Sequence, residues 1–470
     1  MMRPLLALLV LPACIQAAMA APTVAPERID AVFAQWNRSD SPGCAATVVD
    51  DGQVVYRKGF GMASLELDVP ITPQTVFYIA STSKQFAAAS IALLAEEGRI
   101  ALDDDVRKYV PELPDYGRPI TISHLVHHTS GLRDHLGLFG LAGGNAADAY
   151  PEARALRLIA SQKATNYPPG TEYLYSNANY FLLSLIVKRA SGMNLRQYAD
   201  SRIFKPLGMR HTLFYDDASE IVHGRTIGHN GSAQEGWTLQ RTNFDLVGDG
   251  GLLTTVDDLV LWERNFHHNR LGKGGQDLIQ QLTTPGSLDD GTPIEYGFGL
   301  MMSHYRGLPT VSHGGSFLAY KADMLRFPQQ RLGIYVLCNA GVATPGKASQ
   351  AIADLYLAQA FTEPAPAPPA PRQAGTAPAD SAVKVDASTI AGMAGRYYSE
   401  ELDAYYTLTP AAGGLEVQVG DNAPVQWRVT APDTADGSWT QVRFTRGANG
   451  QVDGFLLDAG RVKHLRFERR

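Results

Sequence analysis

The chain has 470 residues, of which 45% are apolar and 19% are charged, as is usual for a globular protein. A chain of this length holds about three domains of roughly 150 residues each and can bury a large core. Its net charge of −6 shows no basic excess, so we expect no nucleic-acid partner, and composition leaves the oligomeric state open.

The first 20 residues have the pattern of a secretory signal peptide. Arg3 provides the positive start, Leu5 to Leu11 begin an apolar run, and Ala18 to Ala20 fit the small-x-small cleavage rule. We therefore expect residues 1–20 to be removed and the product to be periplasmic or secreted. A lipoprotein anchored at Cys14 is the alternative. No later run reaches the roughly 20 apolar residues of a membrane-spanning helix.

Residues 44–62 predict a β-hairpin, because two apolar runs flank the turn signal Asp50-Asp51-Gly52. Cys44 opens this hairpin, and Cys338 closes a later strand-like run. We expect two buried thiols at these positions. A disulfide is the alternative that export permits, if the two strands are antiparallel neighbours.

A Ser-x-x-Lys motif follows a strand-like run, Val76 to Ala80, and precedes an alanine-rich helical run, Gln85 to Glu97, that ends at Gly98. On a helix Ser81 and Lys84 share a face, because they are three residues apart. A serine hydroxyl needs a neighbour that takes its proton, and an amine with a lowered pKa can do so. The helix N-terminus adds backbone N–H groups that stabilise an oxyanion.

From about residue 103 to 270 the pattern is mostly helical, and strand patterns return after residue 297. Strands, then helices, then strands and a helix are typical of an α/β layer with an inserted helical lobe, which we place at residues 27–361. The predicted helices cover 178–190, 195–204, a segment that starts at Thr255, and 347–361; the predicted strands cover 297–302, 310–313, 320–327 and 332–339.

Residues 362–388 are interpreted as a linker, because the Pro/Ala-rich stretch Pro364 to Pro378 cannot bury a core. A second Ser-x-x-Lys, Ser381 to Lys384, lies directly after this stretch. It lacks the strand-to-helix context of the first copy, and we interpret it as a chance match.

Residues 389–470 alternate with a period of two and are punctuated by glycine-containing turn signals. About eight short strands in about 80 residues predict a small antiparallel barrel-like domain. The end of this domain is basic. We expect its basic side chains to lie on a solvated strand face, and contact with an anionic partner is the alternative. The basic residues are Arg461, Lys463, Arg466, Arg469 and Arg470.

Two further motifs complete the chemistry of Ser81 and Lys84: Tyr175-Ser176-Asn177 before a helix, and His313-Gly314-Gly315-Ser316 at a strand. With these motifs in this order, residues 27–360 resemble the class C β-lactamase and DD-peptidase superfamily, which includes D-aminopeptidases and related esterases. The resemblance implies a β-lactamase/transpeptidase-like fold, with an antiparallel sheet flanked by helices and a helical lobe. The stretches His127 to Leu132 and Gly250 to Thr255 also look like the family.

The resemblance assigns roles to these residues. Ser81 attacks a carbonyl and is acylated, while Lys84 and Tyr175 share the proton transfers as general base and acid. Which of the two takes the first proton stays open. Tyr175 could act as the base only if the charge of Lys84 lowered its pKa. We expect no metal and no organic cofactor.

The resemblance also implies a binding strand. Asn177 would hydrogen-bond a substrate amide, and the backbone N–H groups of Ser81 and Ser316 would form the oxyanion hole. Gly314 and Gly315 would leave room for a substrate that lies along the strand.

His313 departs from the family pattern, because class C β-lactamases carry lysine there. A histidine is only partly charged near neutral pH, so we expect a weaker and pH-dependent hold on a substrate carboxylate. This favours peptidase or esterase chemistry over β-lactamase activity. The sequence thus predicts an exported serine hydrolase that acts on small-molecule or peptide substrates. The preferred interpretation is a peptidase or amidase of the D-amino-acid type. The alternatives are an esterase, a β-lactamase, or an idle penicillin-recognising module.

Overall fold

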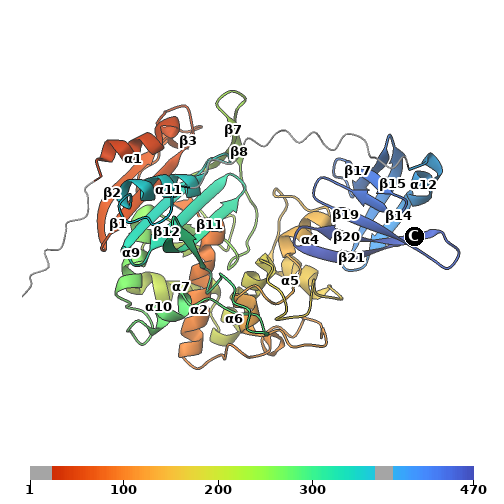
Figure 1. The fold of residues 1–470 in the computed structure, drawn as a ribbon, viewed down its shortest axis with the longest axis horizontal. Helices are drawn as coiled ribbons and strands as arrows, with labels where there is room; N and C mark the ends of the chain where they lie inside the picture. Colours follow the sequence, from red (N-terminus) through yellow and green to blue (C-terminus); the bar gives the residue numbers. More distant parts are fainter. Residues whose placement is uncertain (1–23, 366–384) are drawn as a thin grey trace, which may run out of the picture.

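The computed structural model describes residues 24–365 and 385–470. Figure 1 shows a larger α/β body and a β-barrel beside it. The predicted signal peptide, the centre of the predicted linker and the Ser381–Lys384 motif lie outside the described residues. Within the described ranges, no helix has the length and apolar character to cross a membrane.

A six-stranded antiparallel sheet forms the centre of the larger body. Its order is β10-β11-β12-β13-β1-β2, so the N-terminal hairpin joins the sheet through the pairing of β1 with β13. The predicted hairpin is confirmed. The strands are β1 (Cys44–Asp50), β2 (Gln53–Phe60), β10 (Met301–Tyr305), β11 (Leu308–Phe317), β12 (Tyr320–Phe327) and β13 (Leu332–Cys338).

Helices cover both faces of this sheet, because the residues of β1 alternate between two apolar clusters. Ala46 and Val48 belong to the cluster that includes α1 (Pro26–Val32) and α11 (Pro345–Tyr356). Ala45 and Val49 belong to the opposite cluster, which includes α2 (Lys84–Glu96) and α9 (Val256–His267). Burial on both faces makes the sheet a rigid base for β11.

The buried helix α2 is rich in alanine, and its short side chains let α6 (Asn177–Ser191) pack closely against it. This contact brings Lys84, the first residue of α2, next to Asn177, the first residue of α6. The predicted helix 178–190 is confirmed and ends before Gly192, whose φ of 78° is the left-handed conformation that glycine favours.

Several predicted elements differ from the structure. The helix predicted at 347–361 ends at Tyr356, and the strand predicted at 310–313 extends over Leu308–Phe317. The strand predicted at 76–80 is only β5 (Phe77–Tyr78), because Ala80 has φ 49° and opens a 3-10 turn, Ala80–Ser83. The strand predicted at 297–302 begins at Met301, because a turn around Gly299, with φ 72°, precedes it. The helix predicted at 195–204 is α7 (Leu195–Ala199) followed by a π-helical turn through Phe204.

The remaining elements of the α/β body are the other helices of the lobe and the short turns and strands that link the larger elements. They are the 3-10 turns Ala34–Trp36 and Val106–Lys108; the helices α3 (Ile122–Val126), α4 (His135–Leu141), α5 (Glu152–Ala160), α8 (Lys205–Leu207) and α10 (Asp277–Leu282); and the strands β3 (Met62–Ser64), β4 (Val69–Pro70), β6 (Leu213–Phe214), β7 (Gly228–Ser232), β8 (Gly236–Gln240) and β9 (Leu252–Thr254).

The C-terminal region is a closed barrel of eight strands preceded by α12 (Ala387–Met393), as the alternating pattern predicts. Its interior has a core of its own, in which Phe455 stacks on Phe467 with ring centroids 4.5 Å apart. The strands are β14 (Gly395–Ser399), β15 (Ala404–Ala411), β16 (Gly414–Val419), β17 (Val425–Ala431), β18 (Thr434–Asp436), β19 (Gln441–Arg446), β20 (Val452–Ala459) and β21 (Val462–Arg469).

The barrel is docked on α4 of the α/β body. Leu138 and Leu141 of α4 are buried in the apolar cluster of the barrel, and the Tyr406 hydroxyl donates to the Leu141 carbonyl at 2.8 Å. Arg133 and Glu401 form a buried ion pair across this interface at 2.6 Å. Since breaking such a pair leaves an uncompensated charge, at a cost of about 3–5 kcal/mol, the pair fixes the docking position.

Cys44 and Cys338 form a disulfide, which corrects the expectation of two free thiols. The two residues are directly opposite in the antiparallel pairing of β1 and β13. The sequence alone could not predict this disulfide. The two cysteines are 294 residues apart, and the pairing register of the strands decides which side chains meet.

We expect the double variant Cys44→Ala/Cys338→Ala to lose about 2–4 kcal/mol of unfolding free energy, because the bridge closes a long loop in the unfolded chain. Urea denaturation of both proteins, with and without dithiothreitol, measures this loss. Reductant should lower the stability of the wild type and leave the variant unchanged; equal stability of all four samples would contradict the bridge.

Candidate active site

Ser81 lies in the 3-10 turn that leads into α2, and Lys84 lies directly below it. The Lys84 Nζ atom is 3.3 Å from Ser81 Oγ, 2.9 Å from Asn177 Oδ1 and 2.5 Å from the Asp249 carbonyl oxygen. The amide and carbonyl oxygens can only accept hydrogen bonds, so they take two amine protons. In the neutral amine the lone pair is then left for the proton of Ser81.

Burial lowers the pKa of Lys84 to about 7, although the carboxylates of Asp249 and Asp134 act in the opposite direction. The side chain is fully buried. An amine with this pKa is substantially neutral near pH 7, as a general base must be.

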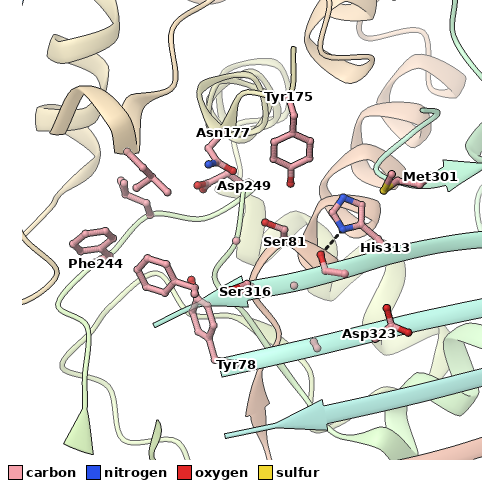
Figure 2. A pocket seen from close by; sticks show the side chains of 18 of the residues that line it. Tyr78, Ser81, Tyr175, Asn177, Phe244, Asp249, Met301, His313, Ser316 and Asp323 are labelled. Carbon is pink, nitrogen blue, oxygen red and sulfur yellow. Dashed lines mark hydrogen bonds between the residues drawn. The ribbon is translucent and has the colours of Figure 1, made fainter. Parts of the chain in front are cut away.

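Tyr175 lies just before α6, and its ring centroid is 4.8 Å from Lys84 Nζ. Its hydroxyl is buried and has no hydrogen-bond partner among the described residues. Figure 2 shows the phenol pointing into the space near Ser81 and His313. Burial raises the pKa of the Tyr175 phenol. The Ser81 side chain acts in the opposite direction but does not reverse this shift. The phenol is therefore protonated near neutral pH and is suited to donate a proton.

Asn177 is oriented by a buried carboxylate. Asp134 accepts hydrogen bonds from the Asn177 backbone N–H at 2.7 Å and from its side-chain amide at 2.9 Å. The same carboxylate caps α4 by accepting from the N–H groups of Leu136 and Gly137. The amide oxygen of Asn177 is thereby turned toward Lys84.

His313 lies on β11 and is buried. Its Nδ1 atom is 2.7 Å from the Gly314 carbonyl, shown as the dashed line in Figure 2, and its Nε2 atom is 3.0 Å from the Tyr296 hydroxyl. Because a carbonyl only accepts, Nδ1 carries the proton and Nε2 accepts from Tyr296. Burial lowers the pKa of His313 to about 3, and the charge of Lys84 adds to the shift. The prediction that His313 is partly charged near neutral pH is therefore wrong, because the buried ring is neutral there.

The edge of β11 is free where a substrate strand would pair. The pairing of β10 with β11 ends at Ser312, whereas β12 continues alongside residues 313–317 on the other side. Residues 313–317 thus keep one unpaired edge at the cavity, which permits addition of an extended peptide.

Gly314 and Gly315 have different reasons to lack a side chain. A Cβ at Gly315 would lie 2.2 Å from the Ile79 carbonyl oxygen, so this glycine lets β11 pack against the segment that precedes Ser81. A Cβ at Gly314 would meet nothing closer than 3.9 Å. The expectation that both leave room for substrate holds spatially for Gly314, whereas the space at Gly315 is filled by Ile79.

We expect Gly315→Ala to lose about 1–3 kcal/mol of unfolding free energy, because the added methyl group overpacks a rigid contact. Gly314→Ala is the matched control and should stay within about 0.5 kcal/mol of the wild type, because its position is open. Thermal denaturation of the two variants measures both effects, and equal stability of the two variants would contradict the packing assigned to Gly315.

The predicted residues converge on one cavity of about 550 Å³. Lys84 lies beneath the floor of the cavity and is hydrogen-bonded to two of the lining residues, Ser81 and Asn177. Aromatic side chains form one wall. The predicted residues that line the cavity are Ser81, Tyr175, Asn177, His313, Gly314, Gly315 and Ser316, and the lining also includes Tyr78, Phe244, Phe317, Asp249, Asp323 and Arg461.

The sequence did not predict a role in the site for four residues: His128, Asp134, Asp249 and Arg461. The His128 ring packs against the Tyr175 ring in a tilted arrangement, with ring centroids 4.2 Å apart, and Asp134 orients Asn177. His128 belongs to a family-like stretch and Asp249 directly precedes another, so these stretches were the available signal. Arg461 was predicted on a solvated strand face; it is exposed as predicted, but it lies in the turn between β20 and β21 and lines the cavity.

Comparisons with known proteins agree with this geometry. Residues 13–359 match the family described as Beta-lactamase. A D-aminopeptidase of Gluconobacter oxydans (strain 621H) is 32% identical over 323 residues, which cover 69% of this chain and 60% of the relative. A D-aminopeptidase of Brucella melitensis biotype 2 is 28% identical over 402 residues, 86% of this chain and 72% of the relative.

Among solved structures, a penicillin-binding protein homologue from Pyrococcus abyssi, described as octameric, has the same fold. The TM-score is 0.62 at 22% identity, and the match covers 94% of this chain and 98% of the homologue. The three motifs, their convergence on one cavity and the family match over most of the chain lead to one assignment. The chain belongs to the β-lactamase family and is a serine hydrolase of that family.

Proposed function

We propose that the protein is an exported peptidase or amidase of the D-amino-acid type that works through an acyl-enzyme on Ser81. The observation that carries this proposal is the contact of a buried lysine, whose pKa is about 7, with the hydroxyl of Ser81. The D-aminopeptidase names of the relatives support the substrate class. The chain matches 60% of the length of the Gluconobacter relative.

The reaction starts when neutral Lys84 takes the proton of Ser81 and Oγ attacks the substrate carbonyl. The backbone N–H groups of Ser81 and Ser316 hold the oxyanion. Tyr175 gives its proton to the leaving nitrogen as the C–N bond breaks, and the proton held by Lys84 restores the phenol. Water then attacks the ester by the reverse proton path, which releases the acid and the free serine.

The substrate backbone extends along the free edge of residues 313–317 in this proposal. Asn177 supplies a side-chain amide beside the reacting carbonyl, and the aromatic wall of Tyr78, Phe244 and Phe317 takes an apolar side chain. His313 is neutral and contributes the position of its ring rather than a charge.

A substrate panel tests the proposal with the mature protein. It contains D-alanine p-nitroanilide, the L-enantiomer, D-alanyl-D-alanine peptides, short p-nitrophenyl esters and a chromogenic cephalosporin. We expect hydrolysis of D-amides or D-peptides with a preference over the L-enantiomer of about 10-fold or more. Turnover of esters alone or of the cephalosporin alone would replace the proposal by an esterase or a β-lactamase. No labelling of Ser81 by a fluorophosphonate or a fluorescent penicillin would favour an idle binding module.

A further inference from the structure

The turn between β20 and β21 carries Arg461 from the barrel into the catalytic cavity. The guanidinium carbon lies 4.6 Å from the ring centroid of Tyr175. Of the described residues that line the cavity, Arg461 is the one lysine or arginine. The barrel thus places a permanent positive charge beside the group assigned to proton donation.

The backbone of this turn is fixed to the catalytic body. Asn166 donates to the Arg461 carbonyl at 3.0 Å, and the Asp134 N–H donates to the same oxygen at 3.3 Å. Asn166 also accepts from the Lys463 N–H at 2.8 Å. Because these contacts use backbone atoms of Arg461, they do not depend on its side chain.

Arg133 fixes the strand that follows the turn. Its side chain donates to the carbonyl oxygens of Lys463 at 3.0 Å and His464 at 3.2 Å, while its other end pairs with Glu401. The position of Arg461 is therefore built into the docking of the barrel.

The guanidinium of Arg461 keeps its hydrogen-bonding capacity. Its side chain is 45% exposed, and it donates no hydrogen bond to any described residue. Asp134 forms an ion pair with Arg461 at 3.6 Å, beyond hydrogen-bonding distance, and this carboxylate already accepts four hydrogen bonds, from Leu136, Gly137 and twice from Asn177. The charge is thus available to a bound anion.

The other charged groups of the cavity do not offer an anion site. His313 is neutral, because burial lowers its pKa to about 3. Asp249 is paired with His135 at 3.2 Å and would repel an anion, as would an ionised Asp323. Among the described residues that line the cavity, Arg461 is therefore the one favourable partner for a substrate carboxylate; Lys321 is outside this lining, and its ammonium donates to Ser316 Oγ at 2.6 Å.

We propose that Arg461 is a specificity-determining residue that binds the free carboxylate of the leaving residue, so that the enzyme removes a C-terminal residue from a peptide. This inference rests on the proposed function, in which Tyr175 protonates the leaving nitrogen. In an amino-acid leaving group the carboxylate is attached to the same α-carbon as that nitrogen. A guanidinium that lies over the Tyr175 ring is placed to hold it.

The test compares N-acetyl-D-alanyl-D-alanine with its C-terminal carboxamide, which differ only in the carboxylate. We expect the wild type to prefer the free acid in kcat/KM by about 10- to 100-fold, mostly through KM. Arg461→Gln should reduce this ratio to about one, and Arg461→Lys should keep part of it.

Arg466→Gln is the matched control, because it removes the same charge from β21, the strand that directly follows the turn of Arg461. Arg466 has a side chain that is 54% exposed, lies beside Glu468 and does not line the cavity. This variant should retain the wild-type ratio. A ratio near one in the wild type, or an unchanged ratio in Arg461→Gln, would overturn the proposal.

A binding measurement separates failure of this inference from failure of the proposed function. N-acetyl-D-alanine and N-acetyl-D-alaninamide compete with fluorophosphonate labelling of Ser81 in the wild type and in Arg461→Gln. Preferential protection by the acid, lost in the variant, supports the anion site even if neither peptide is hydrolysed. Equal protection by acid and amide in the wild type contradicts the site, whatever the enzyme hydrolyses. Rapid labelling of Arg461→Gln shows that its active site is folded, and if this variant fails to label, the uncharged variant Arg461→Met replaces it in both arms.

Discussion

Ser81→Ala is expected to lose turnover of every substrate that the wild type hydrolyses, by about 10⁴-fold or more, because no acyl-enzyme can form. The variant should also lose all labelling by fluorophosphonate. The Ser81 side chain contributes little to the fold, since it lines the cavity and its hydroxyl lies 3.3 Å from Lys84 Nζ. Kinetics with the preferred substrate and circular dichroism of both proteins measure these outcomes.

Ser83→Ala is the matched control within the same motif. Ser83 donates to the Ala80 carbonyl at 2.5 Å and accepts from the Leu252 N–H at 3.1 Å, so its hydroxyl supports the turn and does not face the cavity. This variant should lose about 1–3 kcal/mol of stability and still label at Ser81. Full activity of Ser81→Ala would contradict the assignment of the nucleophile.

Lys84→Met is expected to lower kcat/KM by about 10²- to 10⁴-fold, because it removes the general base and keeps a side chain of similar length. The pH profile provides a second readout. Since the amine must be neutral to accept a proton and its pKa is about 7, wild-type kcat/KM should rise with pH through a midpoint near 7. Below this pH Lys84 is protonated and idle. The residual activity of Lys84→Met should lack this rise.

Tyr175→Phe separates the base from the acid. The variant should lose kcat, because the leaving nitrogen has no proton donor, and should keep the rise near pH 7 that belongs to Lys84. His313 cannot supply this rise, because its pKa of about 3 is far below the range. If the rise of kcat/KM near pH 7 persisted in Lys84→Met and disappeared in Tyr175→Phe, Tyr175 would be the general base and Lys84 the acid.

The sequence was sufficient for the parts of the molecule that depend on local pattern. Ser81 and Lys84 share one helical turn, so their contact follows from spacing alone. The alternation of residues 389–470 predicts the barrel strands, because period two is a property of each strand. Tyr175 and His313 came from the family resemblance, because nothing local relates residues so distant in the chain.

Other features depend on tertiary contacts that no local pattern encodes. The Cys44–Cys338 bridge requires the register of β1 against β13. The neutrality of His313 requires its burial, which a histidine in a strand does not reveal. Arg461 reaches the cavity because Asn166 and Arg133 fix the barrel to the catalytic body, and the basic run that contains it has the composition of an ordinary solvated strand.

The central claim is that Ser81 carries the acyl group during turnover with Lys84 as its base. Acid quenching of the enzyme during hydrolysis of a D-amino-acid substrate, followed by peptide mass spectrometry, tests this claim most directly. We expect an acyl adduct on the peptide that contains Ser81, and this adduct should form more slowly in Lys84→Met. Turnover without any adduct on Ser81 under conditions that trap the intermediate, or an adduct on another residue, would contradict it.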